Sequence, residues 1–170
     1  LLLFIDTSPL NPDYAREAKY QEAYEQGASE QLSWINTMLA QDQYTWKVVI
    51  GHHPLYSSGK RYGKTNAIKD VLEPVFHKHN VNLYIAGHEH DLQHNQLAGD
   101  ELVHVVSGGG SEVRPVGNYE FTQFAKSTGG FVSVSMTAKS IFLNYIDHQG
   151  KKVYAHTINK PNTASSSSTL

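Results

Sequence analysis

Histidines gather in two motifs of this sequence, Gly51-His52-His53-Pro54 and Gly87-His88-Glu89-His90, and each motif directly follows a short apolar run. Neutral imidazole is a good ligand for zinc, iron and related transition metals. In an extended segment, residues i and i+2 point to the same side, about 6–7 Å apart. Two metal ions that share a bridging oxygen lie about 3.5–4 Å apart. His88 and His90 could therefore each bind one ion of a pair, and His52 could add a third ligand.

The competing interpretation is that these histidines are ordinary polar loop residues with satisfied hydrogen bonds. Three histidines at two neighbouring strand ends favour the metal site, which we therefore predict. A helical His-Glu-x-x-His zinc site is excluded, because the histidines here are two residues apart and follow a strand. The role of His53 stays open: it could lie over the metals as a proton donor or point into the loop. For Asp91 and His94 we expect surface or loop-structuring roles.

A third motif, Ser107-Gly108-Gly109-Gly110-Ser111, also follows an apolar run. Glycine lets the backbone approach a ligand closely or turn sharply, and the sequence leaves both roles open. Open α/β sheets bind their ligands just beyond the carboxyl ends of the parallel strands. The three motifs therefore indicate one functional edge of such a sheet.

The elements that must hold these motifs alternate between strand and helix in the first half of the chain. We predict strands at 1–5, 46–50 and 81–86, helices within 14–26 and 29–39, and a third helix that follows Thr65 and carries the apolar pattern of 68–76. Ser29 and Thr65 are the expected N-caps of the second and third helices. Pro74 lies inside the third helical pattern, which predicts a kink or two short helices. This alternation is typical of parallel strands with right-handed crossovers.

The second half of the chain has strands without helices between them. The pattern predicts strands at 102–107, 131–137, 140–146 and 153–158, joined by hairpin turns. The predicted fold class is therefore α/β, with a mixed sheet in which parallel strands come first and an antiparallel meander follows. We expect residues 1–160 to form one folded unit and residues 161–170, which contain four consecutive serines, to be a flexible tail.

Composition limits the possible partners. Fourteen Lys and Arg against sixteen Asp and Glu give a net charge of −2, so nucleic acid is not expected as a partner. The chain has no cysteine, which excludes disulfides and thiolate chemistry. Its apolar runs are too short to span a bilayer, so no membrane partner is expected. The first five residues are apolar and lack a lead-in, so we expect the chain to begin inside a domain.

The motifs and their order resemble those of purple acid phosphatases, and the small tartrate-resistant acid phosphatases in particular. Val49-Ile50-Gly51-His52 with Pro54 resembles two elements of that family, and Gly87-His88-Glu89-His90 resembles its Gly-His-x-His motif. The flanking segments 4–7, 31–35, 87–93 and 106–110 follow in the expected order. The resemblance implies the C-terminal half of a layered α/β/β/α metallophosphoesterase sandwich.

The resemblance also implies an activity: hydrolysis of phosphate monoesters by a metal-bound hydroxide at a dinuclear centre of iron plus zinc, iron or manganese. In that reading His52 and His88 bind the divalent metal and His90 binds the iron. Family motifs that supply a bridging Asp, a Tyr and an Asn precede these positions and do not occur here. We therefore expect the N-terminal half of the domain to be missing and this chain alone to be inactive. A secreted or periplasmic location is implied by the resemblance only.

Several alternatives stay open. Arg61 stands near the place where the mammalian branch carries a candidate acid, and it could bind substrate phosphate or be an exposed loop charge. The chain could be a non-catalytic metal-binding or partner-binding module, or a calcineurin-like phosphodiesterase. Without its other half, one apolar sheet face on 81–86 and 102–106 and one strand edge should be exposed, which predicts a homodimer through that face or edge. The alternative is that the C-terminal meander covers this face.

Overall fold

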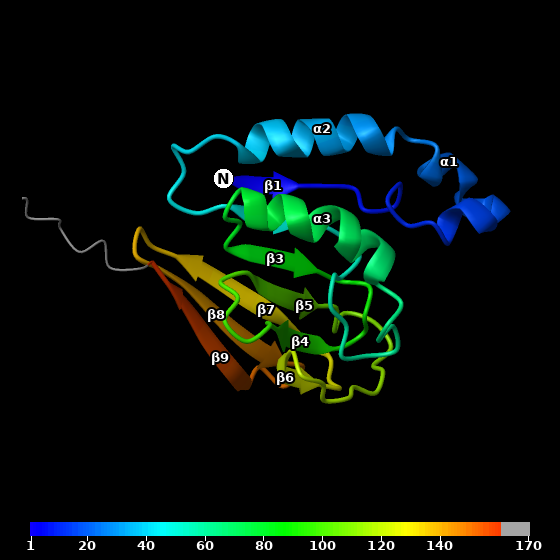
Figure 1. The fold of residues 1–170 in the computed structure, drawn as a ribbon. Helices are drawn as coiled ribbons and strands as arrows, with labels where there is room; N and C mark the ends of the chain where they lie inside the picture. The colour runs from blue at the N-terminus through cyan, green and yellow to red at the C-terminus, as the bar shows by residue number, and fades with distance from the viewer. Residues whose placement is uncertain (161–170) are drawn as a thin grey trace, which may run out of the picture.

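The computed structural model describes residues 1–160, which form a six-stranded and a three-stranded sheet (Figure 1). In spatial order the larger sheet consists of β1 (Leu2–Phe4), β2 (Val48–Ile50), β3 (Leu83–Ala86), β5 (Val103–Ser107), β4 (Leu92–Asn95) and β6 (Thr122–Lys126). The strands β1, β2, β3 and β5 are parallel, and β4 is antiparallel to both its neighbours. The carboxyl ends of β2, β3 and β5 therefore share one edge.

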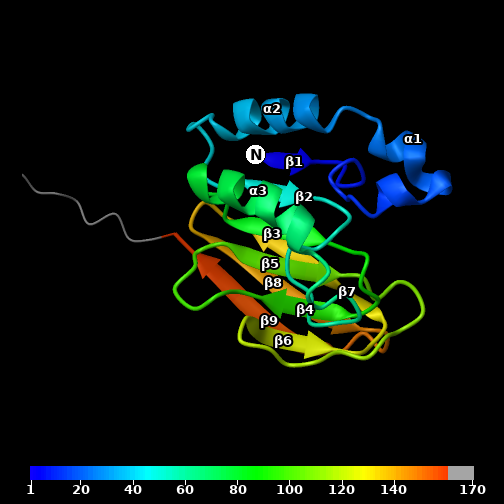
Figure 2. The same ribbon diagram turned by 45° about the vertical axis from the view of Figure 1, so that its right-hand side comes forward.

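Two helices cover one face of the larger sheet, as Figures 1 and 2 show. They are α2 (Ala28–Leu39) and α3 (Asn66–Lys78). The helix α3 buries Ile68, Leu72 and Phe76, which are spaced four residues apart and so lie on one side of the helix. These side chains pack with Tyr84 and other sheet residues in one apolar cluster. Helix formation here is driven mainly by this packing.

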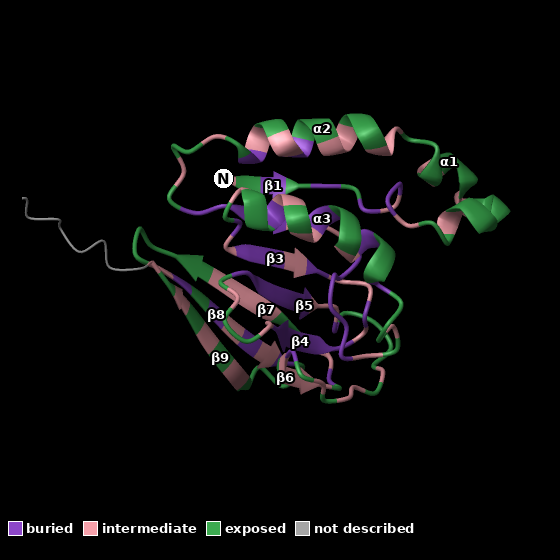
Figure 3. Ribbon diagram, viewed as in Figure 1, coloured by how far each residue is buried: buried purple, intermediate pink, exposed green. Residues whose placement is uncertain are grey.

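The smaller sheet covers the opposite face. It is an antiparallel meander of β7 (Gly130–Met136), β8 (Ser140–Asp147) and β9 (Lys152–Asn159). Alternate residues of β8, namely Ile141, Leu143 and Tyr145, are fully buried against the larger sheet. Figure 3 shows the central strands mostly buried, whereas β9 alternates in burial. The layers are thus helices, six-stranded sheet and three-stranded sheet.

The predicted fold class is confirmed: parallel strands come first and antiparallel strands follow. Two strands were not predicted, β4 and β6, whose sequences Leu-Gln-His-Asn and Thr-Gln-Phe-Ala-Lys lack apolar alternation. All four residues of β4 are buried, although three of them are polar. Gln93 and Asn95 are bonded to the loop at Tyr56 and Ser58, and the Gln93 carbonyl accepts from Tyr145 of β8, so tertiary contacts stabilise this strand in place of an apolar pattern.

The helix expected over 14–26 is wrong. The segment contains two 3₁₀ turns, Tyr14–Arg16 and Ala18–Tyr20, and one short α1 (Gln21–Tyr24). None of the residues in these turns is buried. A longer helix would have no apolar face to pack, and isolated helices of this length are marginal in water.

The details of the two long helices also differ from expectation. Ser29 is not the N-cap of α2, because the helix begins after Gly27, whose φ of 75° only glycine adopts readily. Thr65 does occupy the N-cap of α3, but its hydroxyl donates to the carbonyl of Leu55 and not to the helix. Pro74 does not divide α3, which runs continuously through it.

The expected exposed sheet face is also wrong, because β7–β9 cover it. Leu83, Val103 and Val105 face the smaller sheet, while Tyr84 and Leu102 face the helices. The chain therefore covers this face, and the homodimer loses the apolar face that motivated it. A dimer through the open edge at β1, where Leu2 and Phe4 are exposed, stays a prediction. The serine-rich tail lies outside the described residues. No helix within 1–160 has the length and apolar character that crossing a membrane requires.

Candidate metal centre

His52 and His88 meet at the carboxyl edge of the parallel sheet. Strands β2 and β3 pair in register from Val48 with Leu83 to Ile50 with Ile85, and each histidine stands two residues beyond its strand. The His52 Nε2 and His88 Nδ1 atoms lie 2.9 Å apart. Ring nitrogens of His52, His53 and His88 all lie within 4.8 Å of one another. The structure therefore gathers three imidazoles from two strand ends.

Local backbone geometry allows this approach. A Cβ atom at Gly51 would lie 2.5 Å from the Tyr84 hydroxyl and 2.8 Å from a Thr7 methyl carbon, so any larger residue would have to displace them. His88 has a φ of 65°, a left-handed conformation that is strained for a residue with a side chain. This strain falls on the residue whose ring meets His52, and strained residues of this kind cluster at functional sites.

His53 is buried and held on both sides of its ring. Its Nδ1 lies 2.7 Å from the Thr7 hydroxyl, and its Nε2 lies 3.0 Å from the Tyr14 hydroxyl. Burial, and then the charges of His52 and Arg61, lower the pKa of His53 to about 4. His53 therefore neither points freely into the loop nor carries a charge near neutral pH. Its role as proton donor stays a prediction, and a neutral imidazole is a weaker donor than an imidazolium.

His90 lies outside the cluster of three. Its Nδ1 is 2.8 Å from the carbonyl oxygen of Glu112 and donates to it. In the neutral ring this bond selects the tautomer with the proton on Nδ1 and the electron pair on Nε2. Metal-bound histidines are commonly oriented by such a bond. The expected trio of His52, His88 and His90 is therefore only partly gathered, and His53 takes the third place.

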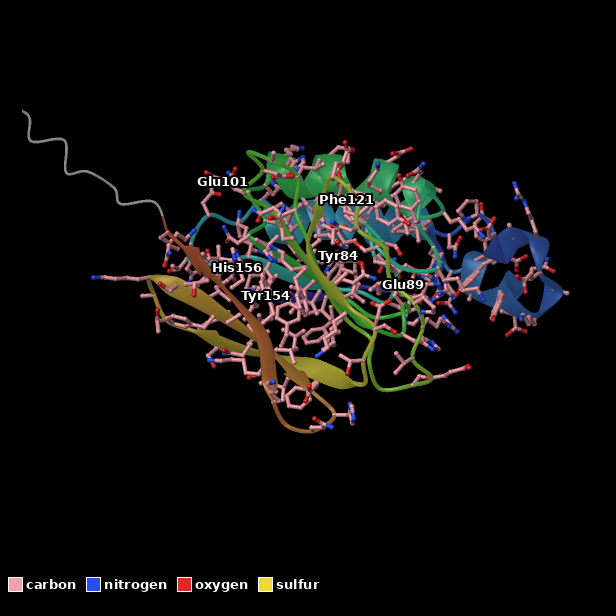
Figure 4. The ribbon with its side chains drawn as sticks, turned by 90° about the horizontal axis from the view of Figure 1, so that it is seen from below. Tyr84, Glu89, Glu101, Phe121, Tyr154 and His156 are labelled. Carbon is pink, nitrogen blue, oxygen red and sulfur yellow. The ribbon has the colours of Figure 1, made fainter. Side chains whose placement is uncertain are left out.

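Glu89, which lies between His88 and His90 in the sequence, holds the neighbouring loop in place. It is fully buried, and its carboxylate accepts from the Ser57 hydroxyl at 2.6 Å and the Arg61 backbone N–H at 2.7 Å. Figure 4 shows Glu89 at the end of the molecule that lies towards α1. The motif spacing did not indicate this role, because it assumed an extended segment, whereas residues 88–90 form a bend in which His88 has a φ of 65°.

Arg61 is tied to the second histidine motif. Its Nη1 donates to the carbonyl of His88 at 3.2 Å and lies 3.4 Å from a carboxylate oxygen of Glu89. Its side chain is 25% exposed, so it is not a free loop charge. The remaining guanidinium N–H groups have no protein acceptor within residues 1–160. They are therefore available to a ligand.

Residues in and after the second and third histidine and glycine motifs lie in close contact with other segments of the chain. Asp91 and His94 are buried, which rules out the surface half of the expectation and leaves the structuring role. Burial raises the pKa of Asp91 to about 7, and its carbonyl accepts from the N–H of Gly108. A Cβ at Gly108 would collide with the Glu89 carbonyl, and one at Gly109 would collide with Gly130. These glycines serve the close approach of protein segments.

A cavity of about 300 Å³ opens beside His53 and His88. Three basic side chains line it, Lys60, Arg61 and Lys64, against one acidic side chain, Asp13. Neither lysine forms an ion pair within the described part of the chain. The local charge is thus positive although the whole chain is slightly negative. This favours an anionic ligand next to the histidines. The two lysines were not singled out by the sequence motifs.

The clustered donors fit one divalent transition metal. Burial lowers the pKa of His88 to about 3 and lowers that of His52, so both rings are neutral and can donate electron pairs. No carboxylate joins this cluster within residues 1–160. A second, more highly charged ion needs anionic ligands that the described histidines do not supply.

Comparisons with known proteins agree with this geometry. The family model for calcineurin-like phosphoesterases matches residues 10–92. Purple acid phosphatase 4 of Arabidopsis thaliana is 29% identical over 165 residues, covering 90% of this chain and 48% of the relative. Tartrate-resistant acid phosphatase type 5 of Sus scrofa is 34% identical over 139 residues, covering 75% and 40%. The chain spans about half the length of the curated relatives it matches.

Solved structures share the fold. Purple acid phosphatase PPD1 from yellow lupin (Lupinus luteus) seeds has a TM-score of 0.70 at 21% identity, covering 79% of this chain and 29% of that one. GAP50, described as the anchor in the inner membrane complex of Plasmodium, has a TM-score of 0.72 at 24% identity, covering 94% and 49%. At these identities the likeness establishes the fold and nothing finer.

The layered sheet, with histidines beyond the ends of its parallel strands, defines a metallophosphoesterase fold. Residues 10–92 match the model of the calcineurin-like phosphoesterase family, and the resemblance to purple acid phosphatases and tartrate-resistant acid phosphatases is confirmed.

Proposed function

We propose that this chain contributes the histidine ligands of a metal-dependent hydrolase that acts on phosphate monoesters. The observation that carries the proposal is the contact of His52 with His88, 2.9 Å between nitrogens, at the carboxyl edge of the parallel sheet. The family match and the acid phosphatase names of the relatives support the reaction type. The basic cavity beside these histidines supports an anionic substrate.

The proposed centre holds two ions, iron and a divalent zinc, iron or manganese. His52 and His88 would bind the divalent ion, and the free Nε2 of His90 would bind the iron. The anionic ligands, including a bridge, would come from a polypeptide segment outside this sequence. When bound, such ions polarise phosphoryl oxygens and lower the pKa of water to give a nucleophile near neutral pH.

The residues of this chain would position the substrate. Arg61 keeps guanidinium N–H groups for the phosphate, and Glu89 fixes its backbone so that these groups face the cavity. Lys60 and Lys64 would add positive charge at the cavity rim. His53 would form the wall beside His88, held by Thr7 and Tyr14. Its donation of a proton to the leaving alkoxide stays a prediction.

Zinc titration of the purified chain tests the ligands. We expect modest affinity, because neutral imidazoles without carboxylates leave the ion poorly charge-compensated. His88→Ala should weaken binding at this cluster more than about tenfold, a loss above about 1.4 kcal/mol. His148→Ala, an exposed histidine outside the cluster, is the matched control and should bind as the wild type. Unchanged binding in His88→Ala would reject the assignment.

Phosphatase assays test the reaction. The 170-residue chain should hydrolyse p-nitrophenyl phosphate little or not at all with added zinc or iron. A longer protein that joins this chain to the remaining ligands should be active, and Arg61→Ala should raise its KM more than it lowers kcat. Robust metal-dependent hydrolysis by the chain alone would overturn the division of ligands proposed here.

Assays on the same two proteins, the 170-residue chain and the longer one, also distinguish two alternative functions. A phosphodiesterase would hydrolyse bis-p-nitrophenyl phosphate faster than the monoester. A non-catalytic binding module would retain zinc but hydrolyse neither compound. The binding module stays the second candidate because no carboxylate joins the histidine cluster within residues 1–160.

A further inference from the structure

A second group of metal-ligand side chains lies far from the histidine cluster. Glu73 and His77 stand one turn apart on α3, and Asp100 precedes β5. Because β5 is parallel to β2 and β3, its start lies at the edge opposite to His52 and His88. Figure 4 shows this separation: Glu101, the neighbour of Asp100, and Glu89, the neighbour of His88, are at opposite ends of the sheet.

The three side chains converge with suitable spacing. One ligand atom from each lies within 4.8 Å of the other two. The His77 Nε2 and an Asp100 carboxylate oxygen are 3.0 Å apart. A zinc ion with ligands at about 2.0–2.2 Å requires its ligand atoms to lie no more than about 4.4 Å apart. A small adjustment of the flexible Glu73 side chain would bring the ligand atoms from within 4.8 Å to within about 4.4 Å of one another.

Each carboxylate is oriented by a bond to its other oxygen. The Leu102 backbone N–H donates to Asp100 Oδ1 at 2.9 Å, which leaves Oδ2 towards His77. The Tyr56 hydroxyl donates to Glu73 Oε1 at 2.6 Å, and Oε2 has no donor within residues 1–160. Metal ligands typically have such supporting hydrogen bonds. The Asp100 side chain is only 15% exposed, so its position is well fixed.

No lysine or arginine neutralises the negative charge of the two carboxylates in the described part of the chain. No Lys or Arg forms an ion pair with Glu73 or Asp100 within the described chain, where His77 is the only basic partner. Two nearby carboxylates repel each other, and a divalent cation would neutralise both. One imidazole with two carboxylates is a ligand set that suits zinc and leaves a coordination position for water.

We propose that Glu73, His77 and Asp100 form a second metal site, which binds a divalent transition metal such as zinc. The metal would join α3 to the loop between β4 and β5. Its position at the opposite edge from the cavity gives it a structural role. This site does not depend on the proposed phosphatase activity.

Zinc stoichiometry tests the site. By calorimetry and metal analysis, the wild-type chain should bind two zinc ions, and His77→Ala should bind one. The double variant His52→Ala/His88→Ala should also bind one, and its cobalt(II) form should show visible absorption that His77→Ala in the same background abolishes. Equal zinc binding in the wild type and in His77→Ala would overturn the proposal.

Conservative variants separate metal binding from folding. Asp100→Asn keeps an oxygen for the Leu102 N–H, and Glu73→Gln keeps an oxygen for Tyr56. Both should fold with an unchanged circular dichroism spectrum and lose the second zinc ion. His148→Ala should keep both ions. Retention of two ions by both conservative variants would show that the group is only an ion pair with a neighbouring glutamate.

Discussion

Histidines lie at both ends of the parallel sheet, next to basic side chains at one end and next to carboxylates at the other. At the carboxyl end, His52, His53 and His88 meet beside a cavity lined by basic side chains. At the other end, one histidine stands between two carboxylates. In the two proposed sites the same imidazole ligand would serve two purposes. A metal at the first end would still attract an anionic substrate, whereas the carboxylates at the second end would neutralise the charge of the metal itself.

The two ends also differ in how they are supported. The carboxyl end depends on the buried Glu89, which holds the segment 57–61, and on close backbone approaches at Gly51 and Gly108. The opposite end depends on the single loop that carries Asp100 and on the surface of α3. Mutations should therefore affect the stability of the first end far more than that of the second.

Removal of Glu89 should have the largest effect. Glu89→Ala leaves the Ser57 hydroxyl and the Arg61 backbone N–H without an acceptor in a buried place, which should lower the free energy of unfolding by about 3 kcal/mol. Urea denaturation measures this. Glu101→Ala, an exposed glutamate at the opposite end, should change it by less than about 0.5 kcal/mol. If both variants lost a similar free energy of unfolding, the two ends of the sheet would not differ in how much they depend on a buried carboxylate.

His104 lies on β5 and is a buried histidine that belongs to neither proposed metal site. Both ring nitrogens lack a hydrogen-bond partner in the described structure, and burial lowers its pKa to about 3. The unfolded side chain has a pKa of about 6.5, so it takes up a proton as the pH falls while the folded one does not. Stability should therefore fall by about 2 kcal/mol between pH 7 and pH 5 through this residue.

His104→Leu should remove that contribution. Urea unfolding at pH 7 and pH 5 should show a decrease in the free energy of unfolding that is about 2 kcal/mol smaller in the variant. The exposed His148 gives the control, because His148→Leu should leave the pH dependence as in the wild type. An equal decrease in wild type and His104→Leu would mean that His104 is protonated when folded.

Gly51→Ala should have a smaller effect on the free energy of unfolding. The added methyl group would press on the Tyr84 hydroxyl and on Thr7, and relieving this overlap should cost about 1.5 kcal/mol. Because Tyr84 also bonds the His53 carbonyl at 2.7 Å, the displacement should weaken zinc binding at the cluster as well. Gly110→Ala, where the new atom meets nothing within 4 Å, should be neutral in thermal melting and in zinc titration.

The smallest effect is expected for His77→Ala in metal-free buffer. The His77–Asp100 pair is partly exposed, and such pairs contribute less than about 1 kcal/mol. With zinc added, the wild type should gain thermal stability that this variant does not gain. A loss of several kcal/mol without metal would show that the pair is a structural ion pair and not a ligand group.

The sequence by itself determined the order of strands and helices, the parallel-then-antiparallel arrangement and the placement of two histidine motifs after strands. These depend on local signals: apolar periodicity, turn residues and motif spacing. It failed where the local signal was weak, as in the buried polar strand β4 and the loosely structured segment 14–24.

Only the tertiary structure decided which histidines meet and which side chains surround them. It brought His53 into the cluster and left His90 outside, because the backbone turn at His88 is not readable from spacing. It covered the sheet face that seemed exposed, since packing between residues 83–105 and 141–145 is long-range. It also joined Glu73 and His77 with Asp100, more than 20 residues further along the chain. Contacts between distant segments are set by how the layers pack, which no local pattern encodes.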